Sequence, residues 1–344
     1  VVGCTDRTLR FFDLPKSFGN VVKLNHVEKL STKGIPMVID ICCHRNLLFC
    51  GDSDGYIDVY NTRQSIKKER TVQAHSHTPI RQLRFVPFLD AIISAGLDGS
   101  LIITYIRDWR PSLLIRNGRG IISFDISEST HTMVVVGFDQ KVEIIDPLVR
   151  SRIGFLGNSA GNHGHRDMII GVSINDKFNQ IITASQDNVL KIWDVRDHRL
   201  LQTVTDENQS GSTNCIAVNG QGTLFSCGFN ISSWQPSPST SYGNSGTDAC
   251  DFDANATGSS STGIVHKLPS CYQDRSSANI TENYCLATSS GHILCCESSG
   301  KAALYNAYRR KEIYRFHVSH GNFQLVGIVL HANEKSFFTA AENG

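Results

Sequence analysis

One pattern recurs along the chain: an alternating apolar segment, a polar turn that carries an aspartate, and a second alternating apolar segment. The most complete copy runs from Ile181 to Asp194 and ends in the dipeptide Trp193-Asp194. Period-two alternation on both sides of a turn rich in Gly, Asp and Asn predicts a β-hairpin. The turn aspartate recurs at Asp6, Asp54, Asp98, Asp139 and Asp187, and in altered form near Asn230, at Ser299 and at Asn343. A chain built from copies of one hairpin is restricted to repeat folds.

The spacing of the copies selects among the repeat folds. Successive turns are separated by about 41–48 residues, with one interval of about 69, and a period near 40–45 with short strands is typical of a β-propeller blade. The sequence therefore predicts an all-β propeller of four-stranded antiparallel blades, in which seven blades are favoured and eight are the alternative. All-β folds of this size can form one unit, so a length of 344 residues does not require two domains.

The two ends and the wide interval define the expected domain organisation. The first unit lacks its opening strand and the last stops inside its turn, so we expect a piece of a longer protein. Residues 1–310 are predicted to form the propeller, and residues 311–344 to begin a further blade that closes the ring or opens a second propeller. Residues 235–262 are dominated by Ser, Gly, Asn, Thr and Asp, which predicts a disordered insertion, after which residues 263–268 resume the blade.

Histidines occupy an equivalent place before several of the turns. His165 precedes Asp187 by about 22 residues and His75 precedes Asp98 by about 23, a fixed offset within a repeated unit. With these offsets the chain resembles the WD-repeat family, whose units carry Gly-His near the start and Trp-Asp at the end. The resemblance covers essentially the whole chain, although only the fifth unit carries both dipeptides.

The resemblance implies a hydrogen-bonded network within one blade, made by a buried histidine, a strand hydroxyl, the turn aspartate and the tryptophan. The matching residues are His165, Thr183, Asp187 and Trp193, with Ser185 as the less favoured hydroxyl. A carboxylate beneath a tight turn must be hydrogen-bonded, and imidazole, hydroxyl and turn amides can supply those bonds. The incomplete copies add Asp6, Asp54, His75, Asp98 and Asp139 to the residues expected to stabilise blades.

Catalysis is the alternative interpretation of these residues. A hydrolase reading of His165, Asp187 and a nearby serine is disfavoured, because the same spacing recurs in other blades and an active site has no reason to repeat around a fold. A propeller enzyme with a central-channel site would need acidic, His or metal-ligand residues on several innermost strands, and those strands read as apolar. Without a phosphate-binding loop or a C-x-x-C pair, we expect a non-enzymatic protein with no cofactor and no metal.

The residue just before each turn aspartate is expected to point towards one rim of the propeller, as the resemblance implies. The series is Thr5, Ser53, Leu97, Phe138, Gln186, Phe229 and Ser298. Three of these side chains are large and apolar, and exposed apolar groups ringed by polar ones mark partner sites. We therefore expect a peptide or helix of a partner protein to dock over Leu97, Phe138 and Phe229, around Gln186; the alternative is that these side chains pack into neighbouring loops.

Charge and cysteine usage limit the partners and the compartment. A formal net charge of +1 gives no electrostatic argument for nucleic acid or an anionic membrane surface. Eleven cysteines without a regular frame favour a reducing compartment. We expect an intracellular, cytoplasmic scaffold that binds proteins or peptides.

Three segments carry a weaker resemblance and suggest a more specific setting. They are DRTLRFFDLP, GDSDGYIDVY and SQDNVLKIWDVR. These segments look like parts of large WD-repeat proteins with two propellers in tandem, known from testis and ciliated tissue. The resemblance implies an alternative role as a structural component of a ciliary, axonemal or cytoskeletal assembly.

Overall fold

The computed structural model describes most of the first 205 residues and the strands that follow them. The described residues are 2–4, 7–13, 25–63, 65–157, 164–187, 189–205, 215–218, 224–227, 231–236, 263–267, 283–287, 292–297, 301–306, 311–317, 325–330 and 337–341. Within them the chain forms 29 β-strands and two short 3-10 turns, η1 (Cys43–Arg45) and η2 (Pro87–Leu89). No helix in this part of the chain has the length and apolarity that a bilayer crossing requires.

Consecutive strands form small antiparallel sheets, and six of the sheets that the described residues build have four strands each. The first three comprise β4 (Pro36–Cys42), β5 (Leu47–Asp52), β6 (Tyr56–Asn61) and β7 (Lys67–Gln73); β8 (Ile80–Val86), β9 (Ala91–Gly96), β10 (Ser100–Tyr105) and β11 (Pro111–Arg116); and β12 (Ile121–Ile126), β13 (Met133–Gly137), β14 (Val142–Asp146) and β15 (Ser151–Leu156). The next three comprise β16 (Ile169–Asn175), β17 (Gln180–Ser185), β18 (Val189–Asp194) and β19 (Leu200–Thr205); β20 (Cys215–Val218), β21 (Leu224–Cys227), β22 (Ile231–Pro236) and β23 (Gly263–Lys267); and β24 (Asn283–Ala287), β25 (His292–Glu297), β26 (Lys301–Asn306) and β27 (Lys311–His317).

Two smaller sheets lie at the ends of the described chain. The first contains β1 (Val2–Cys4), β2 (Thr8–Asp13) and β3 (Asn25–Ser31), and the last contains β28 (Leu325–Leu330) and β29 (Phe337–Ala341).

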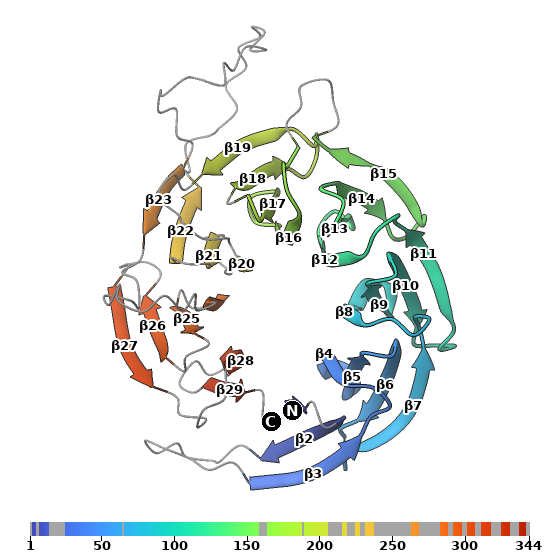
Figure 1. Cartoon of the computed structure of the whole chain (residues 1–344). Helices are drawn as coiled ribbons and strands as arrows, with labels where there is room; N and C mark the ends of the chain where they lie inside the picture. Colours follow the sequence, from blue (N-terminus) through green and yellow to red (C-terminus); the bar gives the residue numbers. More distant parts are fainter. Residues whose placement is uncertain are drawn as a thin grey trace, which may run out of the picture.

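The sheets are arranged around a ring, with the first strand of each four-stranded sheet nearest the centre and the fourth at the perimeter (Figure 1). Neighbouring sheets touch through these inner strands, because β4 contacts β8, β8 contacts β12, and β12 contacts β16. The repeated four-stranded sheets confirm the predicted propeller fold, whereas the number of blades stays a prediction. Since every complete sheet has the same strand order, the turns between second and third strands share one side of the ring. We call this side the turn rim; its best described turns contain residues 52–56, 96–100, 137–141 and 185–187.

Burial follows the position of a strand in its sheet. The second strands β5, β9 and β13 are buried along their whole length, because a neighbouring sheet covers each of their two faces. The sequence of β13 (Met133–Gly137) is accordingly a continuous apolar run and not an alternating one. The perimeter strands β7 and β15 are largely exposed.

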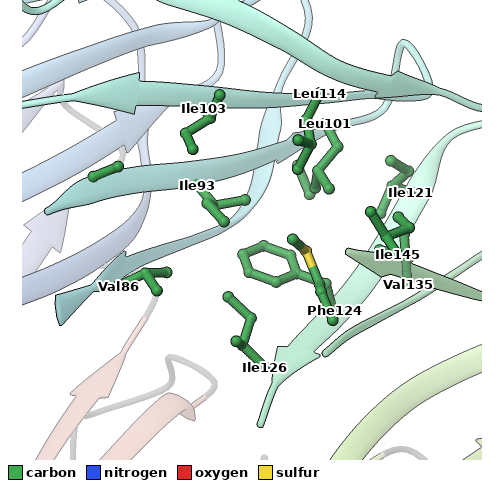
Figure 2. Close-up of a cluster of buried hydrophobic side chains, with 13 residues drawn as sticks. Val86, Ile93, Leu101, Ile103, Leu114, Ile121, Phe124, Ile126, Val135 and Ile145 are labelled. Atoms are coloured by element: carbon green, nitrogen blue, oxygen red, sulfur yellow. The ribbon is translucent and has the colours of Figure 1, made fainter. Parts of the chain in front are cut away.

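The core between the β8–β11 and β12–β15 sheets shows how neighbouring blades are joined. Phe124 of β12 lies among Ile93 of β9, Leu101 of β10 and Val135 of β13 (Figure 2). Phe124 is almost fully buried, and burying a side chain of this size contributes about 1.5–3 kcal/mol. Each such cluster belongs to two sheets at once, so no single sheet buries its apolar faces alone.

Polar side chains on the innermost strands add hydrogen bonds between sheets. The carboxylate of Asp40 on β4 accepts the backbone N–H of Phe85 on β8 at 2.6 Å. The Gln82 side chain on β8 bonds both the N–H and the C=O of Phe124 on β12, each at 2.8 Å. Asp125 on β12 accepts the N–H of Ile174 on β16 at 2.7 Å and pairs with Arg84 of β8. The prediction that the innermost strands are apolar is therefore wrong for β4, β8 and β12.

The expected insertion begins later than predicted. Residues 235 and 236 extend β22 and pair with Ile264 and Gly263 of β23, so the boundary at residue 235 is wrong by two positions. The same pairing confirms that residues 263–267 resume this sheet. Residues 237–262 lie outside the described part of the chain. The predicted start of a further blade at residue 311 is wrong, because residues 311–317 form β27, the fourth strand of the β24–β27 sheet. That the later residues close the ring or open a second propeller stays a prediction.

Candidate functional site

Thr183 is the centre of a buried polar group in the β16–β19 sheet. Its hydroxyl lies 2.7 Å from Nε2 of His165 and accepts the indole N–H of Trp193 at 3.0 Å. The Thr183 hydroxyl also faces the carbonyl oxygen of Lys191 at 3.4 Å. The group therefore links the loop before β16 with β17 and β18. Ser185, the other hydroxyl considered from the sequence, instead donates to the Met168 carbonyl at 3.0 Å.

Asp187 is bonded mainly to backbone amides of the surrounding turns. Its carboxylate accepts the N–H of Val189 at 3.0 Å and that of Arg166 at 3.1 Å. Its nearest oxygen is 3.9 Å from Nδ1 of His165, which is an electrostatic contact and not a hydrogen bond. Burial lowers the pKa of His165 to about 4, against the opposing pull of Asp187. The imidazole is therefore neutral at neutral pH.

A related group lies in the β8–β11 sheet around His75. Nε2 of His75 is 2.9 Å from the Ser94 hydroxyl, and its Nδ1 is 2.9 Å from the Ser100 hydroxyl and 3.2 Å from Asp98. Asp98 in turn accepts the backbone N–H of Ser100 at 3.0 Å and its hydroxyl at 2.6 Å. Burial lowers the pKa of His75 as well, although Asp98 opposes the shift. Thr104 occupies the position of the tryptophan, so this sheet has no indole donor.

The β4–β7 sheet differs from the sequence prediction, because Asp52 rather than Asp54 binds the turn. Asp52 is 2% exposed and accepts three backbone N–H groups, those of Gly34, Asp54 and Tyr56, at 2.8–3.0 Å. Asp54 is only partly buried and accepts the Ser53 hydroxyl at 3.1 Å. Asp54 thus lies in the turn that the period predicts, but the carboxylate that accepts the turn amides is that of Asp52.

Asp139 makes no hydrogen bond among the residues that the structure describes, and the β12–β15 sheet has a different polar group. Asn117 stands where the β8–β11 and β16–β19 sheets have histidine. With its NH2 turned towards Glu143, it donates to both carboxylate oxygens at 3.0 and 3.1 Å. Glu143 is buried and pairs with Arg152 at 2.8 Å. Asp6, also expected to belong to such a group, lies outside the described residues.

A similar pair of a buried carboxylate and a cation occurs two sheets away in the ring. Asp58 of β6 is buried and lies 2.7 Å from Nζ of Lys68 on β7. Asp58 pairs across the strands with Thr71 and Glu143 with Phe155, and in each case the cation stands three residues before that strand partner. The two sheets with a buried histidine therefore alternate with two sheets that carry a buried carboxylate–cation pair. These pairs were not predicted from the sequence. The feature that could have indicated them is an acidic residue inside each of the apolar runs YIDVY and VEII.

These buried groups have the geometry of structural contacts. The Thr183 hydroxyl is fully buried and is bonded by an indole and an imidazole, so it is not presented to a substrate. His75 is bonded by two hydroxyls within its own sheet. In the part of the chain that the structure describes, no three His, Cys, Asp or Glu side chains gather as a metal site would require.

Two of the residues expected on the turn rim, Leu97 and Phe138, lie in neighbouring turns. Leu97 and Phe138 are 38% and 41% exposed, and Gln186 is exposed in a further turn. Both apolar residues border Gly120, because a Cβ at Gly120 would lie 2.8 Å from the Leu97 carbonyl and 3.1 Å from the Phe138 ring. The loop before β12 thus brings two of the expected residues together. Ser53 is partly buried, and Thr5, Phe229 and Ser298 lie outside the described residues.

One repeat of the chain, the one that contains the Thr183 group, matches a known protein family. Residues 159–194 match the family model described as WD domain, G-beta repeat. The chain therefore contains a WD repeat. The matched segment contains His165, Thr183, Asp187 and Trp193, so the WD-repeat motif and the buried hydrogen bonds described above coincide. The resemblance inferred from the sequence is confirmed.

Several known proteins are similar in sequence to part of this chain. The chain is 24% identical over 49% of its length to "Cilia- and flagella-associated protein 337 B" of Tetrahymena thermophila, covering 14% of that protein. It is 24% identical over 48% of its length to "U3 small nucleolar RNA-associated protein 21 homolog" of Schizosaccharomyces pombe, covering 18%. It is 32% identical over 24% of its length to "WD repeat-containing protein on Y chromosome" of Drosophila grimshawi, covering 7%. The chain thus spans less than a fifth of each of these relatives.

Proposed function

We propose that this WD-repeat chain is a non-enzymatic scaffold that binds protein or peptide partners on its turn rim. The observation that carries the proposal is the adjacency of Leu97 and Phe138 beside Gly120. Two large apolar side chains that are each more than a third exposed and lie in neighbouring turns offer a ready contact for an apolar anchor of a partner.

The polar surroundings of Leu97 and Phe138 suit a peptide partner. Arg119 is exposed and its guanidinium lies 3.5 Å from the Phe138 carbonyl, while Gln186 is exposed in the turn of a neighbouring sheet. An apolar centre with polar groups at its edge is the usual composition of a protein interface. Phe229 is the proposed third apolar residue of this surface.

A comparison of two matched double variants tests the proposal. Leu97→Ser with Phe138→Ser removes the apolar contact on the turn rim, whereas Phe178→Ser with Leu201→Ser removes two other apolar side chains of similar exposure. Quantitative affinity purification from the native cells should lose specific partners with the first variant and keep them with the second. Equal recovery from both variants would remove the turn rim as the binding surface.

A structural role in a ciliary, axonemal or cytoskeletal assembly is the second candidate function. The cilia- and flagella-associated relative, matched over about half of the chain, favours it. The proposed location is intracellular, in the cytoplasm or the axoneme. Fractionation of isolated cilia tests this role, because a structural component stays with detergent-extracted axonemes. Recovery only in the cytosolic fraction, or with nucleolar particles, would reject it.

A further inference from the structure

The perimeter of the ring carries a strip of arginines and aromatic rings that spans three sheets. Arg70 of β7 lies over the Trp109 ring, with the guanidinium carbon 5.6 Å from the ring centre. Arg107 and Arg150 lie over the Tyr105 ring at 5.1 and 5.5 Å. The strip therefore runs from β7 across the β10–β11 turn to the β14–β15 turn. Figure 1 shows β7, β11 and β15 side by side along the outer edge of the ring.

The strip is fixed in place by contacts between sheets. Arg150 donates to the Ser112 hydroxyl at 3.0 Å and to the Tyr105 hydroxyl at 3.2 Å, although it belongs to the next sheet. The guanidinium groups are thereby held against rings and hydroxyls instead of moving freely in water. A binding surface that is already ordered loses less conformational entropy when a partner arrives.

The charges of this strip are not neutralised within the described part of the chain. The guanidinium groups of Arg70, Arg107 and Arg150 contact rings or neutral hydroxyls, and none forms an ion pair there. The corresponding turn of the β16–β19 sheet differs, because Arg196 and Arg199 pair with Asp194 and Asp197. Cations held over aromatic faces without a carboxylate partner attract an anionic ligand.

Exposed aliphatic side chains lie beside the arginines. Leu148 and Val149 precede Arg150 in the same turn and are 57% and 70% exposed, and Leu113 and Ile153 on the adjoining perimeter strands are also exposed. A surface that combines Arg, Trp and Tyr with exposed aliphatic groups has the composition of an interface centre.

We infer that this strip is a second docking surface, and that its occupant is an acidic protein segment with apolar side chains between its carboxylates. The carboxylates pair with Arg70, Arg107 and Arg150, and the apolar side chains cover Leu148 and Val149. A protein segment fits better than a nucleic acid, because a single strand offers few aliphatic groups for this turn and the whole chain has a net charge of only +1. The surface is separate from the turn rim and does not depend on the proposed function there.

Fluorescence anisotropy with three defined probes tests the inference on the full chain. The probes are a fluorescein-labelled peptide of four Glu-Leu-Glu-Phe repeats, the same peptide with Gln in place of Glu, and a labelled 16-nucleotide oligo-dT. We expect the acidic peptide to bind in a salt-sensitive manner and the other two probes to bind at least about tenfold more weakly.

Two variants and a control locate the binding. Arg107→Gln with Arg150→Gln should raise the Kd of the acidic peptide about tenfold, and Leu148→Ser with Val149→Ser about threefold. The control, Arg196→Gln with Arg199→Gln, should leave the Kd unchanged. The serine variant alters only exposed side chains, so it remains informative if the loss of Arg150 disturbs folding.

Equal Kd values for the wild type and both strip variants would overturn the inference, and so would equally tight binding of the Gln peptide. Preferential binding of oligo-dT with the same sensitivity to the arginine variant would show a nucleic-acid surface instead. Each result leaves the turn-rim proposal untouched, because Leu97 and Phe138 are intact in every variant.

Discussion

Trp193 and Thr183 are joined by a hydrogen bond of 3.0 Å from the indole N–H to the strand hydroxyl. The same hydroxyl lies 2.7 Å from the imidazole of His165. In the β8–β11 sheet Ser94 occupies the matching place and contacts His75 at 2.9 Å, although Thr104 replaces the tryptophan. Both histidine-containing sheets thus keep the strand hydroxyl and its contact with the imidazole, which makes the hydroxyl a good position to test.

Thr183→Val should destabilise the protein by about 2 kcal/mol, because it leaves the indole N–H and the imidazole nitrogen buried without a partner. Thr183→Ser keeps the hydroxyl and loses only a methyl group, so it should cost about 1 kcal/mol or less. Urea unfolding followed by tryptophan fluorescence measures both. If the two variants unfold at the same urea concentration, the hydroxyl contributes nothing beyond its packing.

The stability of the protein should fall as the pH is lowered from 6.5 towards 4. Burial lowers the pKa of His165 to about 4 from a normal value of 6.5, so in this range the unfolded chain binds a proton that the folded chain does not. Because the unfolded state binds more protons, the free energy of unfolding decreases with falling pH, by up to about 3 kcal/mol for this residue.

His165→Gln should therefore flatten the pH dependence of the unfolding midpoint between pH 7 and pH 4.5. The exposed His77 provides the control, and His77→Asn should keep the wild-type slope. An unchanged slope for His165→Gln would show that protonation of this imidazole is not linked to unfolding.

Asp52→Asn should destabilise the protein more than Asp54→Asn. The buried Asp52 carboxylate accepts three backbone N–H groups, and an amide can accept fewer of them, so we expect a loss of about 1–3 kcal/mol. Asp54 accepts only the Ser53 hydroxyl among its described contacts, and its loss should cost about 0.5 kcal/mol or less. Thermal melts of the two variants give the order directly, and a larger loss for Asp54→Asn would restore the assignment made from periodicity.

Arg152→Leu should be more harmful than the double change of Glu143 and Arg152 to leucine. The single variant leaves the buried Glu143 carboxylate without its cation, whereas the double variant removes both charges. Because Arg152 is partly exposed, water screens part of the penalty, and we expect about 1–3 kcal/mol for the single variant. Unfolding midpoints of both single variants, Glu143→Leu included, and of the double variant complete a double-mutant cycle. Additive losses would mean that the two side chains do not interact.

The fold could be predicted from the sequence because the hairpin pattern repeats with a fixed period. The exact carboxylate under a turn could not always be predicted, since the segment GDSDGY offers both Asp52 and Asp54 and periodicity favours the second. The hydrogen bonds of Asp40 and Asp125 between sheets were missed, because each residue interrupts an apolar strand only once and its acceptor role depends on the neighbouring sheet.

The arrangement on the turn rim also needed the structure. Leu97 and Phe138 are far apart in the sequence, and their proximity depends on the loop that places Gly120 between them. The arginine–aromatic strip gave no sequence signal at all, because its members come from three separate hairpins. A surface formed between blades therefore cannot be predicted when each repeat is considered separately.

Site-specific photo-crosslinking from the turn rim tests the scaffold role most directly. A photoreactive phenylalanine analogue at position 138 should crosslink to the partners that the wild-type chain recovers, and the same analogue at position 178 should not. Addition of Leu97→Ser to the 138 variant should weaken the crosslink severalfold. Partners that are still recovered but crosslink from position 178 and not from 138 would contradict the account.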